Sequence, residues 1–173
     1  MLKPAIEYKE EIQRLLKEAY YNDKEKFSYY NPSCDYEFLL GDVKIEKNTM
    51  KKHQFVSIHN EQIVGFISYN INLLNYRVYN MRCISFVNSM TFALDLKRSI
   101  ENIFEVYKFR KMNFEAFVGH PIESSYDRMV EKVNGRIVGI QKEHCKLSDG
   151  KFHDLKIYEI LRKDYLKARG KLR

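Results

Sequence analysis

The chain of 173 residues contains no tryptophan, 3 prolines, 7 glycines and 3 cysteines. The cysteines, Cys34, Cys83 and Cys145, lie far apart in the sequence, which argues against a zinc site or a disulfide framework and favours a reducing compartment. No stretch approaches the ~20 apolar residues that span a bilayer, and no apolar leader precedes the first acidic residues. We therefore expect a soluble cytoplasmic protein that binds no metal and no membrane.

Tyrosine, phenylalanine and basic residues are abundant instead. The chain has 13 Tyr and 11 Phe, and its hydrophobic fraction of 45% excludes a disordered protein. Because no repeat or linker interrupts the pattern, we expect a single domain over residues 1–173. The 30 Lys and Arg residues outnumber the 23 Asp and Glu residues and give a net charge of +7, which favours anionic ligands without identifying them.

Part of this positive charge lies in a basic tail over residues 162–173. We interpret the tail as a solvated segment that keeps the protein soluble. The alternative, an RNA-binding arm, is less favoured because no strand face interleaves aromatic residues with Lys and Arg. A ligand that carries phosphates would suit a basic surface equally well, so nucleic acid is not needed to explain the charge.

The N-terminal half has the pattern of one helix followed by an antiparallel meander. Residues 7–21 place apolar side chains at helical spacing and predict an amphipathic helix. Residues 55–59 and 62–70 predict two strands joined by a tight turn at residues 60–61. Residues 76–87 predict the third strand of the meander, whose last part, from Cys83 onward, is mostly apolar and should be buried.

The third strand is followed directly by a helix over residues 91–107, which has an apolar stripe at offsets of three and four. Ser89 or Thr91 can cap the start of this helix. The first amide N–H groups of a helix have no intrahelical partner, so they should point outward at the end of the strand. A turn of this kind suits a phosphate group.

The C-terminal half alternates strand and helix. Residues 112–118 predict a strand, residues 121–133 a helix, and residues 135–145 and 151–161 the two strands of a long closing hairpin. The strands that flank the helix over residues 91–107 must be parallel, and their carboxyl ends then face one crevice, where open α/β sheets bind ligands. The sequence therefore predicts an α/β fold with a mixed, mostly antiparallel central sheet.

Two stretches carry a resemblance to a known family. Leu96 can be set as the helix leucine that follows a Gln/Arg-x-x-Gly-x-Gly/Ala turn. Asn88, Thr91 and Ala93 then fall at the three marked positions of that turn, and residues 131–139 (EKVNGRIVG) are similar to a Glu-Lys-Leu-Gly-Phe stretch. In these motifs and in the order of its elements, the chain resembles the GNAT superfamily of N-acetyltransferases, which is related to the yeast histone acetylase and binds acetyl-coenzyme A (acetyl-CoA).

The resemblance implies a sheet whose parallel strand pair is splayed at the cofactor site, and acetyl-CoA as cosubstrate. It implies transfer of an acetyl group directly to a primary amine of a small molecule or a peptide. The alternative is a non-catalytic module of the same fold that binds coenzyme A (CoA), a protein or RNA. A homodimer is left open. The residues expected at the coenzyme are Phe86, Val87, Asn88, Met90, Thr91, Phe92, Ala93, Leu94, Lys97 and Arg98.

Candidate catalytic residues follow the second parallel strand. The family's frequent tyrosine acid falls at Val130, and Tyr126 lies one helical turn earlier on the same face. His120, with an ordinary pKa near ~6.5, is the expected general base, and Glu123 is the carboxylate alternative. A backbone N–H within residues 86–88 would meet the oxyanion. Each of these side chains also has a purely structural interpretation, on the surface or in the core.

The acceptor side is expected to involve an aromatic cluster near the N-terminus. Phe27, Tyr29 and Tyr30 lie in a polar segment that covers the acceptor side in the resembled family. They would line an acceptor pocket, or, in the alternative interpretation, pack this segment onto the core. The sequence does not identify the acceptor amine, because loops of variable sequence build the substrate pockets of such folds.

Overall fold

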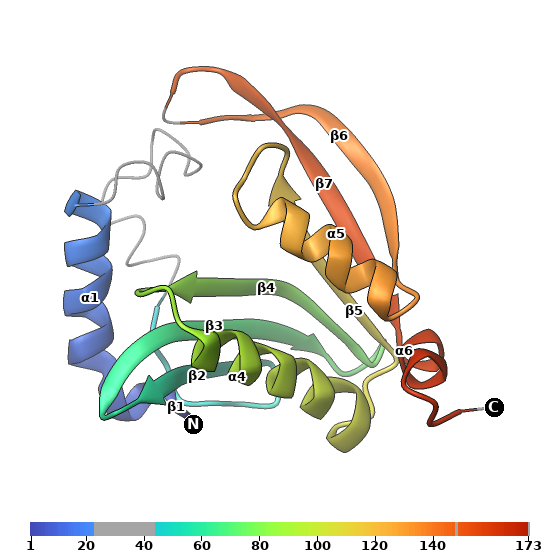
Figure 1. Cartoon of the computed structure of the whole chain (residues 1–173), viewed down its shortest axis with the longest axis horizontal. Helices are drawn as coiled ribbons and strands as arrows, with labels where there is room; N and C mark the ends of the chain where they lie inside the picture. Colours follow the sequence, from blue (N-terminus) through green and yellow to red (C-terminus); the bar gives the residue numbers. More distant parts are fainter. Residues whose placement is uncertain (23–43, 148, 173) are drawn as a thin grey trace.

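A computed structural model of the chain describes residues 1–22, 44–147 and 149–172. The expected acceptor residues Phe27, Tyr29 and Tyr30 therefore lie outside the described residues, as does Cys34. One sheet of seven strands, in the order β1-β2-β3-β4-β5-β7-β6, forms the centre of the molecule (Figure 1).

The strands are β1 (Leu2–Pro4), β2 (Lys52–His59), β3 (Gln62–Asn72), β4 (Arg77–Ser85), β5 (Lys111–Phe117), β6 (Arg136–Lys146) and β7 (Phe152–Leu161). The α-helices are α1 (Lys9–Asn22), α4 (Met90–Glu101), α5 (Glu123–Lys132) and α6 (Arg162–Ala168). A 3-10 turn, η1 (Ala5–Tyr8), precedes α1, and a π-helical turn, η2 (Asn102–Val106), continues α4. The predicted meander, both central helices and the closing hairpin are all present, whereas β1 and α6 were not predicted.

The pairing of β4 with β5 is the one parallel contact among the described strands. It consists of only two residue pairs, Arg77 with Lys111 and Val78 with Met112. All the other strand pairs are antiparallel. Figure 1 shows β4 and β5 starting together and then running apart. The expected mixed sheet with one splayed parallel pair is therefore confirmed.

The hairpin of β2 and β3 forms as predicted. Its turn residues, Asn60 and Glu61, have φ values of 47° and 63°, the left-handed conformation that a two-residue turn of type I′ requires at both positions. β4, in contrast, ends at Ser85, two residues earlier than predicted. Phe86 still donates its backbone N–H to Val64 O at 3.0 Å, so the contact with β3 persists just beyond the strand.

Helices cover both faces of the sheet. On one face α1 packs Ile12 and Leu16 against β-strand residues that include Phe66. On the other face α4, η2, α5 and α6 enclose the larger core, whose residues from these helices include Phe104 and Tyr126. The two helices that follow the diverging strands, α4 after β4 and α5 after β5, therefore both pack on this second face.

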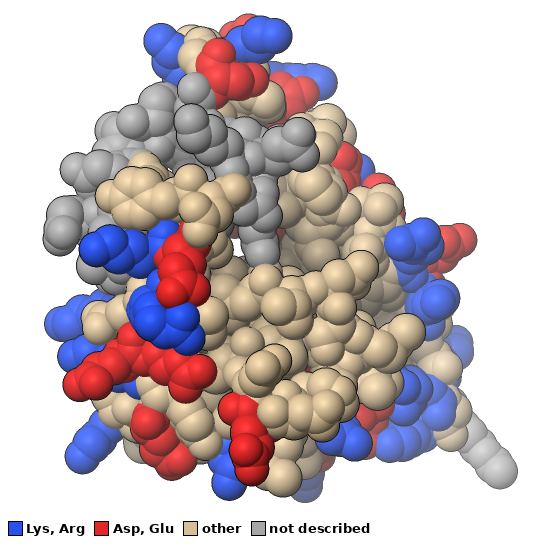
Figure 2. All heavy atoms as spheres, turned by 60° about the vertical axis from the view of Figure 1, so that its left-hand side comes forward, with Lys and Arg blue, Asp and Glu red and all other residues tan. Residues whose placement is uncertain are grey.

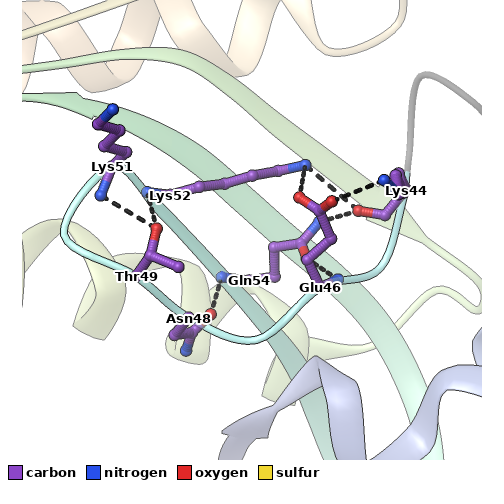
Figure 3. A network of polar contacts seen from close by, with 7 residues as sticks. All are labelled: Lys44, Glu46, Asn48, Thr49, Lys51, Lys52 and Gln54. Carbon is purple, nitrogen blue, oxygen red and sulfur yellow. Dashed lines mark hydrogen bonds and ion pairs between the residues drawn. The ribbon is translucent and has the colours of Figure 1, made fainter.

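The segment before β2 is fixed by one buried side chain. Gln54 is 1% exposed, and its side-chain oxygen accepts a hydrogen bond from Glu46 N at 2.7 Å, while its amide nitrogen donates to Lys44 O at 2.9 Å. Asn48 Oδ1 accepts from Gln54 N at 2.6 Å. Figure 3 shows these contacts, which satisfy the polar groups of Gln54 and tie residues 44–48 to the sheet.

The prediction that residues 162–173 form a solvated tail is wrong for the first part of this segment. These residues begin with α6, in which Tyr165 is 3% and Leu166 is 8% exposed. The Tyr165 ring stacks on Phe104 with a centroid distance of 4.8 Å. The pair of adjacent apolar residues anchors the helix to the core, because burying these side chains stabilises the docked helix.

A buried carboxylate connects α4 to the sheet. Asp95 is 1% exposed and accepts a hydrogen bond from Ser57 Oγ at 2.8 Å. The α-ammonium group of Met1 lies 2.9 Å from the same carboxylate, and Arg98 lies 3.4 Å from its other oxygen. These partners compensate the cost of removing a charge from water. They also direct Arg98 toward Asp95.

The start of α4 is fixed by a close contact with β3. Gly65 lies inside β3, where a glycine predicts a bulge or a close backbone approach. The Phe92 ring occupies the space beside it, so that a Cβ atom built on Gly65 would lie 2.2 Å from that ring. Glycine at this position therefore permits the packing of Phe92, which is 8% exposed.

We predict that Gly65→Ala lowers the free energy of unfolding by about 1–3 kcal/mol, because the added methyl group must displace the Phe92 ring. Gly139→Ala is the matched control, since no atom lies within 4 Å of a Cβ atom built on this other strand glycine. Urea unfolding of both variants measures the difference. Equal stability of the two variants would show that the contact with Phe92 is not a constraint.

Candidate active site

A cavity of about 350 Å³ lies where β4 and β5 have separated, a volume typical of small-molecule sites. We call it the β4–β5 cleft. Both strands contribute to it, together with the segment after β5, the start of α5 and the closing hairpin. Its lining residues are Asn80, Met81, Arg82, Cys83, Ile84, Glu115, Ala116, Phe117, His120, Ile122, Tyr126, His144, Cys145 and Leu155. Of the three expected catalytic residues, His120 and Tyr126 lie in this cleft.

Tyr126 reaches the cleft from α5 and is held by other aromatic rings. It is 7% exposed, and its ring packs edge-on against Phe114 and Tyr158 at centroid distances of 4.8 and 5.7 Å. Burial raises the pKa of Tyr126 well above its ordinary value, and the neighbouring Cys83 adds to this rise. The Tyr126 hydroxyl therefore keeps its proton and serves as a hydrogen-bond donor in the cleft. Val130 is buried in the core and does not line the cleft.

Cys83 faces Tyr126 from β4. Burial raises the pKa of the Cys83 thiol to about 12, although a hydrogen bond from Tyr126 partly opposes this rise. The thiolate is the nucleophilic form of cysteine, so Cys83 is a poor nucleophile at neutral pH. Cys83 is therefore poorly suited to form a covalent intermediate in the cleft.

His120 follows β5 and is fixed in one tautomer. Its Nδ1 atom accepts a hydrogen bond from Ile122 N at 3.0 Å. Burial lowers the pKa of His120, and the charge of Glu123 only partly opposes this change. The imidazole is therefore neutral near neutral pH and carries its proton on Nε2. This arrangement argues against the expected role of His120 as a general base and favours a role as a hydrogen-bond donor.

Glu123 does not line the cleft and has structural partners. Its carboxylate accepts a hydrogen bond from Gly119 N at 2.7 Å and forms an ion pair with Lys156. The hydrogen bonds from Lys156 and Gly119 lower the pKa of Glu123. Lys156 also contacts Asp127 at 3.1 Å. Glu123 therefore ties the start of α5 to β7 and does not occupy a position for general-base catalysis.

The turn between β4 and α4 differs from the expected phosphate cradle. The Phe92 side chain is in the core, and the Phe86 N–H already binds Val64 O, so neither of these groups is available to a ligand. Because the Phe86 N–H donates to Val64 O, it is not the oxyanion donor that the sequence predicted. Three large apolar side chains around this turn are exposed: Val87 is 51%, Met90 76% and Leu94 51% exposed.

The backbone at the start of α4 still presents amide groups. Ser89 is the N-cap residue, but its side chain makes no capping hydrogen bond. The intrahelical pattern begins with Ala93 N to Ser89 O at 3.4 Å, so the N–H groups of residues 90–92 precede it. Ala93 and Lys97 line a second, apolar pocket of about 170 Å³ between α4 and α5. Arg98 lies elsewhere, beside Asp95.

Several cleft residues were not predicted from the sequence. Arg82 and Cys83 come from β4, Glu115 from β5, and His144 from β6. Alternation along β5 places Glu115 on the face opposite its buried neighbours, and only the separation from β4 brings it to the cleft. The signal available from sequence was polar residues near the carboxyl ends of two parallel strands, the edge where such sheets bind ligands.

Two features of the described residues bear on possible partners. No helix among residues 1–22, 44–147 and 149–172 is long and apolar enough to cross a membrane. Within the same ranges, no three His, Cys, Asp or Glu side chains gather in a way that could hold a metal ion.

Solved acetyltransferase structures share this fold. A spermidine N-acetyltransferase from Vibrio cholerae, in complex with CoA and spermine, superposes with a TM-score of 0.68 at 18% identity, covering 96% of this chain and 97% of that chain. The same enzyme with manganese ions gives 0.64 at 17% identity, covering 96% and 95%. An assigned acetyltransferase from T. thermophilus gives 0.64 at 16% identity, covering 99% and 93%.

No protein-family profile and no curated protein sequence matches the chain. The likeness is thus one of structure at low sequence identity, and it shows the fold. The fold expected from the sequence is confirmed, because the two spermidine N-acetyltransferase structures share it.

We predict that Glu123→Gln destabilises the protein by about 1 kcal/mol at pH 7, because it removes the charge that Lys156 and Gly119 N stabilise. The folded pKa of Glu123 is lowered, so this stabilisation is complete above the ordinary pKa of 4.5 and is lost as the pH falls through the folded pKa. Urea unfolding at pH 7, 5 and 3.5 should show the difference from wild type shrinking. Glu131→Gln, at an exposed site on the same helix, should change stability little at any pH. A difference that is the same at every pH would contradict the assignment.

Proposed function

We propose that the protein is an acetyl-CoA-dependent N-acetyltransferase that moves an acetyl group directly to a primary amine of a small molecule or a peptide. The observation that carries this proposal is the β4–β5 cleft, into which Tyr126 and His120 present hydrogen-bond donors of fixed protonation. The shared fold of a spermidine N-acetyltransferase in complex with CoA supports it.

The residues around the cleft fit an extended amide-containing arm. β4 pairs with β5 only as far as Val78, so the backbone groups of β4 that face β5 beyond this point have no ladder partner in β5. Polar backbone groups in this position would hydrogen-bond to the amides of the coenzyme. The N–H groups at the start of α4 would meet its pyrophosphate, with Lys97 nearby on the same helix. Bound acetyl-CoA supplies the acetyl thioester.

Tyr126 is the group we assign as general acid. Its hydroxyl is protonated at neutral pH and lies at the point where β4 and β5 diverge. As the new carbon–nitrogen bond forms and the carbon–sulfur bond breaks, Tyr126 would donate its proton toward the leaving sulfur and recover one from solvent. This places the proton donor one helical turn before Val130, the position that the family resemblance indicated.

His120 is assigned a second role in the same step. Because its Nδ1 atom accepts from Ile122 N, its Nε2–H is a donor that would stabilise negative charge developing on the thioester oxygen. The attacking amine would lose its proton to water, since no carboxylate or unprotonated imidazole nitrogen is assigned to take it. Glu115, which lines the cleft, would attract a cationic amine toward it.

A non-catalytic module of the same fold is the second candidate. Thr91 stands at the first glycine position of the coenzyme turn, where a side chain limits how closely the backbone can approach a pyrophosphate. This feature, together with the exposed apolar side chains of Val87, Met90 and Leu94 around the turn, favours the module. Calorimetric titration with acetyl-CoA, followed by a screen of amine acceptors, separates the two. Spermidine and spermine are the first acceptors to test, since a structural neighbour binds spermine. Binding without transfer to any amine would favour the module.

We predict that Ala93→Asp weakens acetyl-CoA binding at least tenfold, because it places a negative charge and extra bulk beside the amides of α4 that would hold the pyrophosphate. An acidic residue in the first turn of a helix is itself favourable, so the variant should fold. Ala93→Ser, which adds one atom and no charge, is the control and should bind within a few-fold of wild type. Unchanged affinity of a folded Ala93→Asp protein would exclude this position from the coenzyme site.

We predict that Tyr126→Phe lowers kcat by ~10²–10⁴, the usual cost of losing a general acid, while leaving the affinity for acetyl-CoA nearly unchanged.

His120→Ala should lower kcat by ~10²–10³, the usual cost of losing one oxyanion donor, without changing the shape of the pH–rate profile between about pH 6 and 8. Steady-state kinetics with the acceptor found in the screen measures both effects. If His120→Ala instead removes an acid limb from the profile, His120 is the general base after all.

A further inference from the structure

The end of the molecule opposite the β4–β5 cleft contains another cavity, of about 440 Å³. It lies beside the parallel contact where β4 and β5 begin, between the chain before β5, the end of β7, and α6. Four cations line it: Lys108, Arg110, Arg162 and Lys163. Its other lining residues are Leu161, Leu166 and Leu172, and no Asp or Glu lines it. In the view of Figure 2, Lys and Arg side chains lie along the right-hand side as well as at the top and on the left.

We call this cavity the basic pocket. Its cations differ in their ion pairing from the cations next to the pocket. Lys111 pairs with Glu159 and Lys171 pairs with Glu105, so neighbouring cations have carboxylate partners. Among the described residues, Lys108, Arg110 and Lys163 form no ion pair with a carboxylate. Four cations that line one cavity with no carboxylate among its lining residues make an anionic ligand the favourable occupant.

The backbone fixes the segments that carry these cations. Arg162 N donates to Arg110 O at 2.9 Å, and Arg110 N donates to Tyr76 O at 2.8 Å. The side chain of Arg162 is held as well, by a hydrogen bond from Nε to Phe104 O at 2.7 Å. Lys108 has a φ of 58°, a left-handed conformation that is unfavourable for a lysine and that persists only where the surroundings impose it. These hydrogen bonds therefore fix the chain segments that form the basic pocket.

We infer that this basic pocket binds a small organic anion, with a phosphate or similar charged group among the cations and an apolar part on the leucines. Charge alone would suit any polyanion, but the cavity volume lies in the range of small-molecule sites, and three leucines line the cavity beside the cations. A nucleic acid or a membrane surface would need an extended basic face and would gain little from Leu166, which is 8% exposed. The inference does not rest on the proposed transfer activity.

Octyl phosphate is a suitable probe, because it joins a phosphate to an apolar chain. The absence of tryptophan from the chain allows a direct reporter, since Leu172→Trp places the only indole at this pocket. Titration should change the tryptophan fluorescence saturably, and the apparent affinity should fall as salt is added. Inorganic phosphate and octanol, each carrying half of the recognised chemistry, should bind at least tenfold more weakly.

The charge requirement is tested in the Leu172→Trp background with Arg110→Gln and Lys163→Gln together. Loss of two charge-assisted contacts should weaken octyl phosphate binding at least tenfold. Lys47→Gln with Lys132→Gln removes the same charge from exposed positions elsewhere and should leave the affinity unchanged. Equal binding by the two double variants, octanol binding as tight as that of octyl phosphate, or binding only to anionic phospholipid vesicles would overturn the inference. Calorimetry on the chain with Leu172 intact checks that the reporter does not create the site.

Discussion

The separation of β4 from β5 is the constraint on which the candidate active site depends. Two residue pairs, Arg77 with Lys111 and Val78 with Met112, join the strands, and beyond them each strand continues with another neighbour. β4 keeps its contact with β3, and β5 keeps its full register with β7. The backbone groups lost from the ladder are the groups that a ligand can use, so the fold exposes polar backbone without dismantling the sheet.

Aromatic packing and one cluster of charged residues fix the elements that surround the β4–β5 cleft. The rings of Phe114 and Tyr158 stack at 5.0 Å across β5 and β7, and Tyr126 of α5 packs edge-on against both. The Tyr158 hydroxyl donates to Asp127 at 2.9 Å, and Lys156 contacts the same carboxylate. Because α5 is tied to β7 in this way, its cleft-facing tyrosine is positioned by the sheet rather than by β4. The contacts of Glu123 and Asp127 with β7 give both carboxylates a structural role.

Local patterns predicted most of the fold. The turn at Asn60 and Glu61, the amphipathic helices and the closing hairpin all follow from spacing and turn chemistry, which act between near neighbours in sequence. α6 was missed because its two buried residues are surrounded by basic ones, and their burial depends on Phe104, far away in the chain. Phe92 was assigned to the coenzyme turn because the sequence does not show that Gly65 leaves room for its ring.

The chemistry of the candidate site was less predictable for a related reason. His120 follows a strand and lines the cleft, but its tautomer depends on one hydrogen bond from Ile122 N, which the sequence does not show. Whether Tyr126 or residue 130 faces the cleft depends on the rotation of α5, which packing decides. The basic pocket combines three separate stretches of chain, so composition indicated a preference for anions without locating it.

A crystal structure of the protein grown with CoA tests the central claim most directly. We predict that the thiol arm of CoA lies between β4 and β5, with its sulfur in contact with the Tyr126 hydroxyl, and that the CoA pyrophosphate lies at the start of α4. CoA bound with its thiol arm outside the β4–β5 cleft, or bound only in the basic pocket beside α6, would contradict it.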